Sequence, residues 1–106
     1  MSNKVKKVRV NDFANYQSAA VVSKTVLAKK AGNITFFAFD KGEKLSEHTA
    51  PYDAYVQILD GRARITISAQ DYILETGEMI IMPANAPHAL IAEEAFKMLL
   101  VMIKSE

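Results

Sequence analysis

The sequence predicts an all-β domain folded as a sandwich or a barrel, and three observations support this fold class. Short apolar runs recur along the chain and are separated by Gly, Pro, Asn and Asp, a pattern typical of many short strands. No long stretch shows a 3.6-residue apolar period, so a helical domain is not expected. An Asp60-Gly61 pair between two alternating segments is typical of a tight turn between antiparallel strands.

The candidate strands follow from the apolar runs. The first alternates valine with lysine and arginine, as a charged edge strand does. Residues 12–18 are expected to form a helical turn instead. The predicted strands are residues 4–10, 21–28, 34–39, 54–59, 62–68, 72–74, 79–82, 88–92 and 96–103.

The central pair of strands is predicted to form a hairpin. Asp60-Gly61 supplies the positive φ angles of a two-residue type I′ turn, so residues 54–59 should pair with residues 62–68. Side chains alternate between the two faces of each strand. The apolar face of this hairpin, which must point into the core, contains Ala54, Val56, Ile58, Ala63, Ile65 and Ile67.

Two other strands, residues 34–39 and 99–103, are apolar on both faces. A small barrel has only one inside, so something must cover their outer faces. A homodimer interface is the economical explanation and makes a homodimer the expected assembly. The alternative is that the N-terminal segment folds back over them.

Composition limits the other possibilities. With 106 residues, the chain is expected to be one domain spanning residues 1–106. It has no cysteine, which excludes disulfides, a thiolate nucleophile and a cysteine-based zinc site. Its net charge is +1 with acids and bases interspersed, so no nucleic-acid partner is expected. A charged N-terminus and the lack of a long apolar run predict a cytoplasmic protein without a membrane partner.

The two histidines lie in two glycine-led segments. Residues 42–61 contain Gly42, five residues, His48, Thr49 and Ala50, then Ala54 and Gly61. This segment resembles the first motif of the cupin superfamily, G-x5-H-x-H-x3-4-E-x6-G. Residues 77–92 contain Gly77, Pro83, Asn85, His88 and Ala92 at the spacing of the second motif, G-x5-P-x-G-x2-H-x3-N.

The resemblance implies a small single-domain cupin of the RmlC-like, conserved-barrel type, folded as a double-stranded β-helix or jelly-roll barrel. It also implies a divalent metal held inside the barrel by three histidines and one glutamate. Only His48 and His88 survive at these positions, because Ala50 and Ala54 replace the other two ligands.

We expect His48 and His88 to meet at the mouth of the barrel. One divalent ion (zinc, manganese, iron, nickel or copper) could be held there, weakly, by these two residues. A thioether of Met82, Met98 or Met102 could supply a third, soft ligand and would favour copper(I). The alternative is a neutral pair hydrogen-bonded across the cavity or to water.

The small side chains of Ala50 and Ala54 are expected to leave a wide, apolar pocket for a small hydrophobic or aromatic ligand. In the loop after Pro51, Tyr52 and Asp53 could grip that ligand or could simply form a turn. The predicted pocket is lined by Ala50, Tyr52, Ala54, Val56, Ile65, Ile67 and Leu90.

The sequence thus predicts a cupin barrel that binds a small molecule, has an incomplete two-histidine metal site and has no assignable reaction. Whether it is an enzyme stays open. One alternative is a metal-dependent enzyme of the oxygenase or isomerase type that completes its site unconventionally. Another is a stability or assembly protein with a vestigial pocket.

Overall fold

The structure is a computed structural model that describes residues 5–104. A short 3-10 helix, η1, precedes eight strands. Their bounds are η1 Val10–Asp12, β1 Val21–Lys29, β2 Gly32–Phe39, β3 Lys44–His48, β4 Asp53–Ile67, β5 Gln70–Glu75, β6 Met79–Met82, β7 His88–Ile91 and β8 Phe96–Ile103. Within the described residues, no helix has the length and the apolar composition that crossing a bilayer requires.

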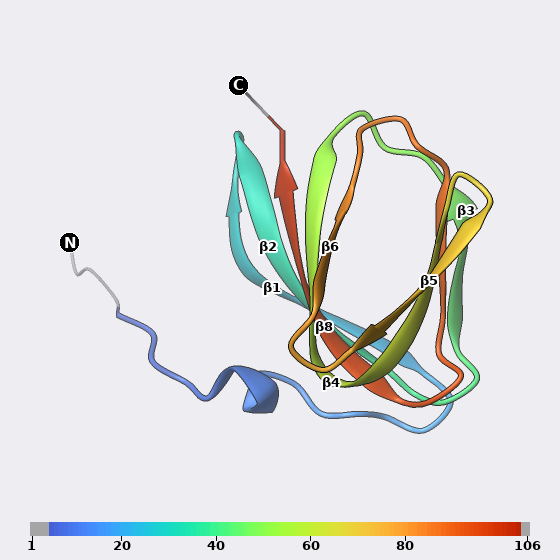
Figure 1. Ribbon diagram of the computed structural model, residues 1–106. Coiled ribbons are helices and arrows are strands. Elements are labelled where there is room, and N and C mark those ends of the chain that lie inside the picture. Colours follow the sequence, from blue (N-terminus) through green and yellow to red (C-terminus); the bar gives the residue numbers. More distant parts are fainter. Residues whose placement is uncertain (1–4, 105–106) are drawn as a thin grey trace.

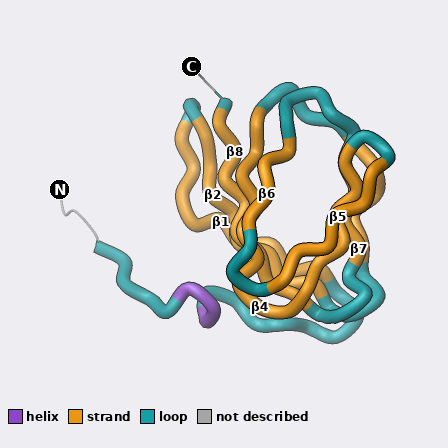
Figure 2. The backbone as a smooth tube through the Cα atoms, viewed as in Figure 1, coloured by secondary structure: helices purple, strands orange, loops and turns teal. Residues whose placement is uncertain are grey.

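The strands form a curled antiparallel jelly-roll barrel, which confirms the predicted fold class. Their order is β1-β2-β8-β4-β7-β3, and β5 and β6 also pair with β4. The barrel has two sides (Figure 1): β1, β2, β8 and β6 pack with the first half of β4, while β3, β5 and β7 pack with its second half. Figure 2 shows that strands make up most of the barrel wall.

The prediction of a hairpin at Asp60-Gly61 is wrong. β4 runs without a turn through both residues, and its two halves pair with β8 and with β5 instead of with each other. A register shift between Ile58 and Asp60, with Gly61 at a φ of +76°, marks a β-bulge there. A bulge uses the same positive φ angle as a tight turn, which is why the dipeptide fits both.

The predicted inner face of β4 is nevertheless confirmed. A hairpin and a bulge both shift the alternation of side chains by one residue, so both put even positions before Asp60 and odd positions after Gly61 on the inside. These six side chains are all at most 8% exposed: Ala54, Val56, Ile58, Ala63, Ile65 and Ile67.

The N-terminal segment differs from the prediction. Lys4 lies outside the described residues, and residues 5–9 form an extended arm that pairs with no strand of the described chain. The helical turn falls at η1 rather than at residues 12–18. β3 was not predicted, because in its sequence KLSEH only Leu45 packs against the core.

The core and the N-terminal segment contact opposite faces of β2, in which Phe36, Ala38 and Phe39 are buried and the other residues are half-buried. Phe39 stacks on Phe96 inside the barrel, with ring centroids 4.5 Å apart. On the outer face, the ring of Phe13 packs 5.8 Å from that of Phe36. Buried Lys97 donates a hydrogen bond of 2.6 Å to the carbonyl of Asn11. The predicted alternative, an N-terminal segment folded over residues 34–39 and 99–103, therefore holds at Phe36 in the first range, whereas Lys97 lies just before the second.

Candidate histidine site

β3 ends at His48 and β7 begins at His88, and the register makes these two residues direct cross-strand partners. Their Nε2 atoms are 3.0 Å apart, and their rings meet edge to face at 4.2 Å between centroids. His88 is 7% exposed, whereas His48 is solvent-exposed. The pair thus reaches from the buried interior to the surface, and residues 40 positions apart in the chain come together.

The backbone fixes the orientation of both rings. His48 Nδ1 lies 2.8 Å from the carbonyl oxygen of Ser46, and His88 Nδ1 lies 3.1 Å from that of Ala86. Because a carbonyl oxygen only accepts, each Nδ1 must donate its hydrogen. Each ring therefore turns its Nε2 toward the other. In two neutral rings of this tautomer both Nε2 atoms carry lone pairs, and a proton or a cation shared between them would satisfy both at once.

The loops beside the histidines are joined by hydrogen bonds. The backbone N–H of Asn85 donates to the carbonyl of Ala50 at 2.7 Å, and that of Ala84 donates to Asp53 Oδ1 at 2.8 Å. The Asp53 carboxylate thus holds the loop before β7. The half-buried Tyr52 lies nearby in sequence, with the Lys104 ammonium 5.8 Å from its ring centroid.

The two alanines at the missing ligand positions offer no donor. Ala54 is 5% exposed and pairs with Met82 of β6 on one side and Met102 of β8 on the other. Ala50 is half-buried in the loop after β3. Across residues 5–104, no group of three or more histidines and carboxylates is positioned to hold a metal. The donors fit a two-nitrogen site and do not fit a centre of three histidines and one glutamate.

The three methionines considered as a third ligand differ in position. Met82 and Met98 are at most 4% exposed and belong to the apolar core, where thioethers commonly fill gaps. Met98 pairs with Phe37 and Ile58, away from Ala54 in the register. Met102 is half-buried beside Ala54.

Five of the seven predicted pocket residues lie on the inside of the barrel. Ala50 and Tyr52 are half-buried in the loop between β3 and β4. The other five are buried in one apolar cluster: Ala54, Val56, Ile65, Ile67 and Leu90. Their role in contacting a ligand stays a prediction.

Two polar clusters that the sequence did not reveal lie outside the histidine site. Arg64 pairs with Asp71 at 3.1 Å and with Glu93 at 2.9 Å. A hydrogen bond from Thr66, and then the charge of Arg64, lower the pKa of Asp71. Near η1, burial and a hydrogen bond to Asp60 raise the pKa of Tyr16. Alternation placed Arg64 and Thr66 on the outer face, but nothing in the sequence marked their partners.

Comparison with known proteins supports the resemblance. The family model described as Cupin domain matches residues 35–104, which include both histidine motifs. Among curated proteins, none matches the chain.

Solved structures give the same result. A conserved protein of unknown function from Streptococcus pyogenes is 39% identical, with a TM-score of 0.91 over 99% of this chain and 92% of that one. A cupin 2 conserved barrel domain protein from Leptotrichia buccalis is 42% identical, with a TM-score of 0.87, over 89% of this chain and 46% of that one. This chain thus spans about half of that protein's length. A cupin superfamily protein from Desulfitobacterium hafniense is 26% identical, with a TM-score of 0.88 over 95% of this chain and 93% of that one.

Proposed function

This chain belongs to the cupin domain family, and we propose that it binds a small molecule inside its barrel. His48 and His88 would hold that molecule in place. One observation carries the proposal: both Nδ1 atoms are held by backbone carbonyls, so both Nε2 atoms face one point, 3.0 Å apart. This separation suits two neighbouring ligands of one ion whose bonds to nitrogen are about 2.1 Å long. A divalent metal ion is the occupant that we propose for this point.

Two protein donors leave most positions around a divalent ion open, since ordinary catalytic sites already use three protein ligands. A small molecule with two oxygen donors of its own would fill the open positions. We therefore expect the metal and a chelating small molecule to bind together, and the metal alone to bind weakly.

The surroundings of the pair define the rest of the ligand. The buried side chains of the barrel interior, among them Ala54, Ile67 and Leu90, favour an apolar or aromatic body on the chelating group. Each Nδ1 is held by a backbone carbonyl rather than by a carboxylate. The rings are thus oriented for binding, and the proposal names no reaction.

A metal titration of tag-free protein tests the proposal. The protein is titrated with Co²⁺ alone and with the one-to-one complex of Co²⁺ and oxalate, and the visible absorption of bound cobalt is followed. We expect the oxalate complex to bind at least tenfold more tightly than Co²⁺ alone, because oxalate supplies two of the missing donors. His48→Ala and His88→Ala should each abolish binding of both.

Glu47→Gln is the matched control, because Glu47 is an exposed neighbour of His48 whose side chain makes no hydrogen bond to either histidine ring among the described residues. It should bind like the wild type. Equal cobalt binding by the wild type and His48→Ala would contradict the proposal. Tight binding of Co²⁺ without oxalate would contradict the two-donor argument.

A further inference from the structure

A row of paired residues runs from the two histidines to β5. The register pairs His48 with His88, and His88 with Ile67 of β4. Ile67 pairs in turn with Gln70, the first residue of β5. Paired residues of antiparallel strands point to the same face of the sheet, and Ile67 belongs to the core. Gln70 therefore lies on the inner face, in the same row as the histidines.

Tyr72 lies in the next row of the inner face. Ile65 pairs with Tyr72 on β5 and with Leu90 on β7. Ile65 and Leu90 are at most 3% exposed, whereas Tyr72 is 37% exposed. Gln70 is exposed as well. These two inner-face side chains of β5 are thus open to solvent, although the residues that they pair with are buried.

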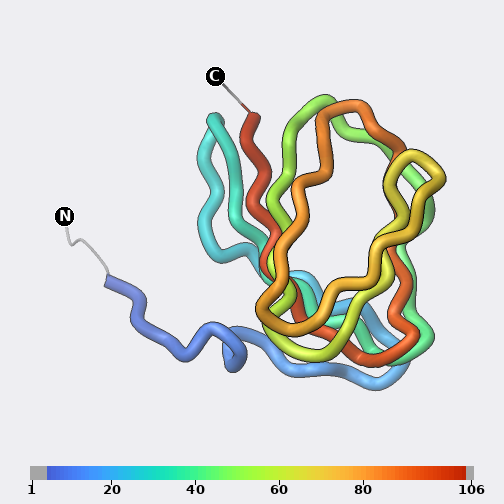
Figure 3. The backbone as a smooth tube through the Cα atoms, in the orientation of Figure 1, coloured from blue at the N-terminus to red at the C-terminus, as the bar shows by residue number. Residues whose placement is uncertain are grey.

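The free edge of β5 explains why they are open. Among the described strands, β5 and β6 pair only with β4, and they diverge from the turn that joins them (Figure 3). A groove of about 510 Å³ between them is lined by inner-face residues of both strands, among them Tyr72, Leu74 and Ile80. The groove therefore borders the inside of the barrel.

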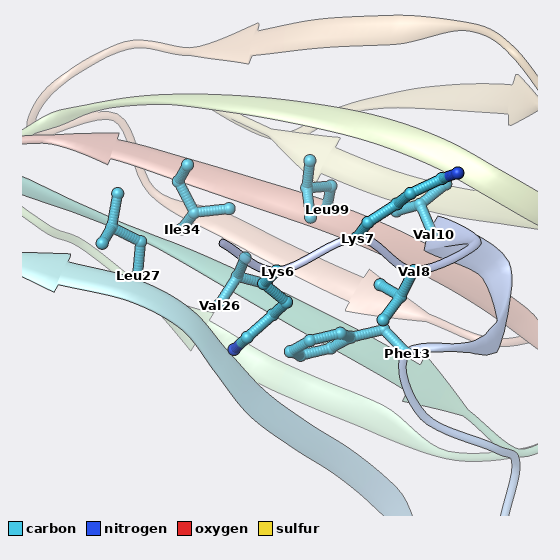
Figure 4. A pocket seen from close by; sticks show the side chains of 9 residues that line it. All are labelled: Lys6, Lys7, Val8, Val10, Phe13, Val26, Leu27, Ile34 and Leu99. Atoms are coloured by element: carbon cyan, nitrogen blue, oxygen red, sulfur yellow. The ribbon is translucent and has the colours of Figure 1, made fainter. Parts of the chain in front are cut away.

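A larger groove, of about 720 Å³, lies under the N-terminal arm (Figure 4). Its strand residue Leu99 pairs with Gln57, whose neighbours Val56 and Ile58 point into the core. The sheet therefore separates this groove from the histidine pair, and a ligand held by the histidines cannot lie in it.

We propose that Gln70 and Tyr72 select the small molecule that the histidine pair holds, and that this molecule is an aromatic chelator with an uncharged polar group at its far end. This inference rests on the proposed function. The ring of Tyr72 would pack against the aromatic ring, and the Gln70 amide would hydrogen-bond to the polar group. Within residues 5–104 neither the amide nor the Tyr72 hydroxyl makes a hydrogen bond, unlike the hydroxyls of Tyr16 and Tyr55.

The length of the ligand follows from the row. With strands about 4.8 Å apart, Gln70 lies about 12 Å along the sheet from the midpoint of the two histidines. A metal–ligand bond of about 2.1 Å and a hydrogen bond of about 2.9 Å take up part of this distance. About 7 Å remains, which fits a single six-membered ring with a chelating group at one end and a polar group at the other.

The charges near β5 favour an uncharged far end. The charged residues that line the groove between β5 and β6 are Asp71 and Glu78, and both are acidic. A carboxylate or phosphate at the far end would be repelled by these groups. A hydroxyl or an amide can instead exchange a hydrogen bond with the amide of Gln70.

Three hydroxamates with the same chelating group test the proposal. Acetohydroxamate has no ring, benzohydroxamate has one, and 4-hydroxybenzohydroxamate adds a hydroxyl at the far end. Tag-free protein is titrated with the one-to-one Co²⁺ complex of each, and the visible absorption of bound cobalt is followed. The ring should raise the affinity about tenfold. The hydroxyl should raise it about a further fivefold.

The variants separate the two contacts. Tyr72→Ala should remove the preference for the ring, and Tyr72→Phe should keep it. Gln70→Ala should remove only the gain from the hydroxyl. Ile73→Ala is the matched control, since Ile73 is 47% exposed and pairs with Arg64 on the outer face of the same strand. It should bind all three complexes like the wild type, and circular dichroism should show every variant folded.

The results distinguish this inference from the proposed function. If the wild type binds all three complexes equally, or if Tyr72→Ala keeps the preference for the ring, the inference is wrong and the histidine site stands. An acetohydroxamate complex that binds equally to the wild type and to His48→Ala would overturn the proposed function and the inference with it.

Discussion

At the scale of single residues, Ala50 and Ala54 mark two metal ligands that are missing at the histidine end of the barrel. Both stand where the resemblance implies a metal ligand, and both were identified from motif spacing alone. The meeting of His48 and His88 was also predictable, because each motif fixes where its histidine falls on a strand. The carbonyls of Ser46 and Ala86 were not, since any residue has a carbonyl and only the backbone path aims it at a ring.

Restoring a carboxylate at position 54 should strengthen metal binding. Ala54→Glu adds a third donor, so its affinity for Mn²⁺ or Zn²⁺ should rise at least tenfold over the wild type, measured by isothermal titration calorimetry. Without metal, the buried charge should lower the melting temperature, and metal should restore it.

Ala63→Glu is the control for this change, because Ala63 is also buried, on the inner face of the other half of β4. It should lose stability without any recovery on adding metal. An unchanged metal affinity of Ala54→Glu would mean that position 54 does not face the histidines.

The lowered pKa of Asp71 predicts a pH-dependent contribution to stability. A carboxyl whose pKa is lower in the folded than in the unfolded protein stabilises the fold above its unfolded pKa, near 3.8, and this contribution is lost as the pH falls through the folded value. Asp71→Asn should therefore be less stable than the wild type at pH 6, and the difference should shrink toward pH 2. Urea unfolding at both pH values measures it, and a constant difference would contradict the assignment.

At the scale of elements, β4 explains the main difference between sequence and structure. Most strand locations and the inner face of β4 followed from apolar alternation, which reports burial; β3 and the strand predicted at residues 4–10 are the exceptions. Whether Asp60-Gly61 turns the chain back or lets it continue depends on which residues pair with it. The carbonyl of Ala95 lies against Gly61, and Ala95 is so far along the sequence that the local pattern does not reveal this contact. The arm was predicted as a strand for a related reason: alternation identifies a suitable segment but not the neighbour with which it pairs.

The bulge makes Gly61 a sensitive position. A Cβ there would collide with the carbonyl oxygen of Ala95, in addition to the strain of a φ of +76°. Gly61→Ala should therefore lower the free energy of unfolding by more than the about 1–2 kcal/mol that a left-handed conformation alone costs. Gly42→Ala is the control, because Gly42 has a φ of +90° and a Cβ added to it would meet no atom within 4 Å. Equal losses in the two variants, by urea unfolding, would contradict the collision.

At the scale of the whole molecule, β4 joins the two sides of the barrel. It pairs with β8 and β6 through its first half and with β5 and β7 through its second. Amides in the middle of β4 should therefore exchange with solvent only on global unfolding, whereas those of the arm should exchange at once. Native-state hydrogen exchange followed by NMR tests this expectation. Faster exchange in β4 than in β1 would contradict it.

The continuity of β4 also bears on how the chain can be cut or shortened. A hairpin at Asp60-Gly61 would have offered an exposed loop, and such loops are where new termini and inserted domains are best tolerated. Here the same dipeptide lies inside a strand and pairs with Lys97 and Phe96 of β8. The two halves of the barrel therefore share one piece of backbone, and neither should survive as a fragment when the chain is opened at residues 60–61.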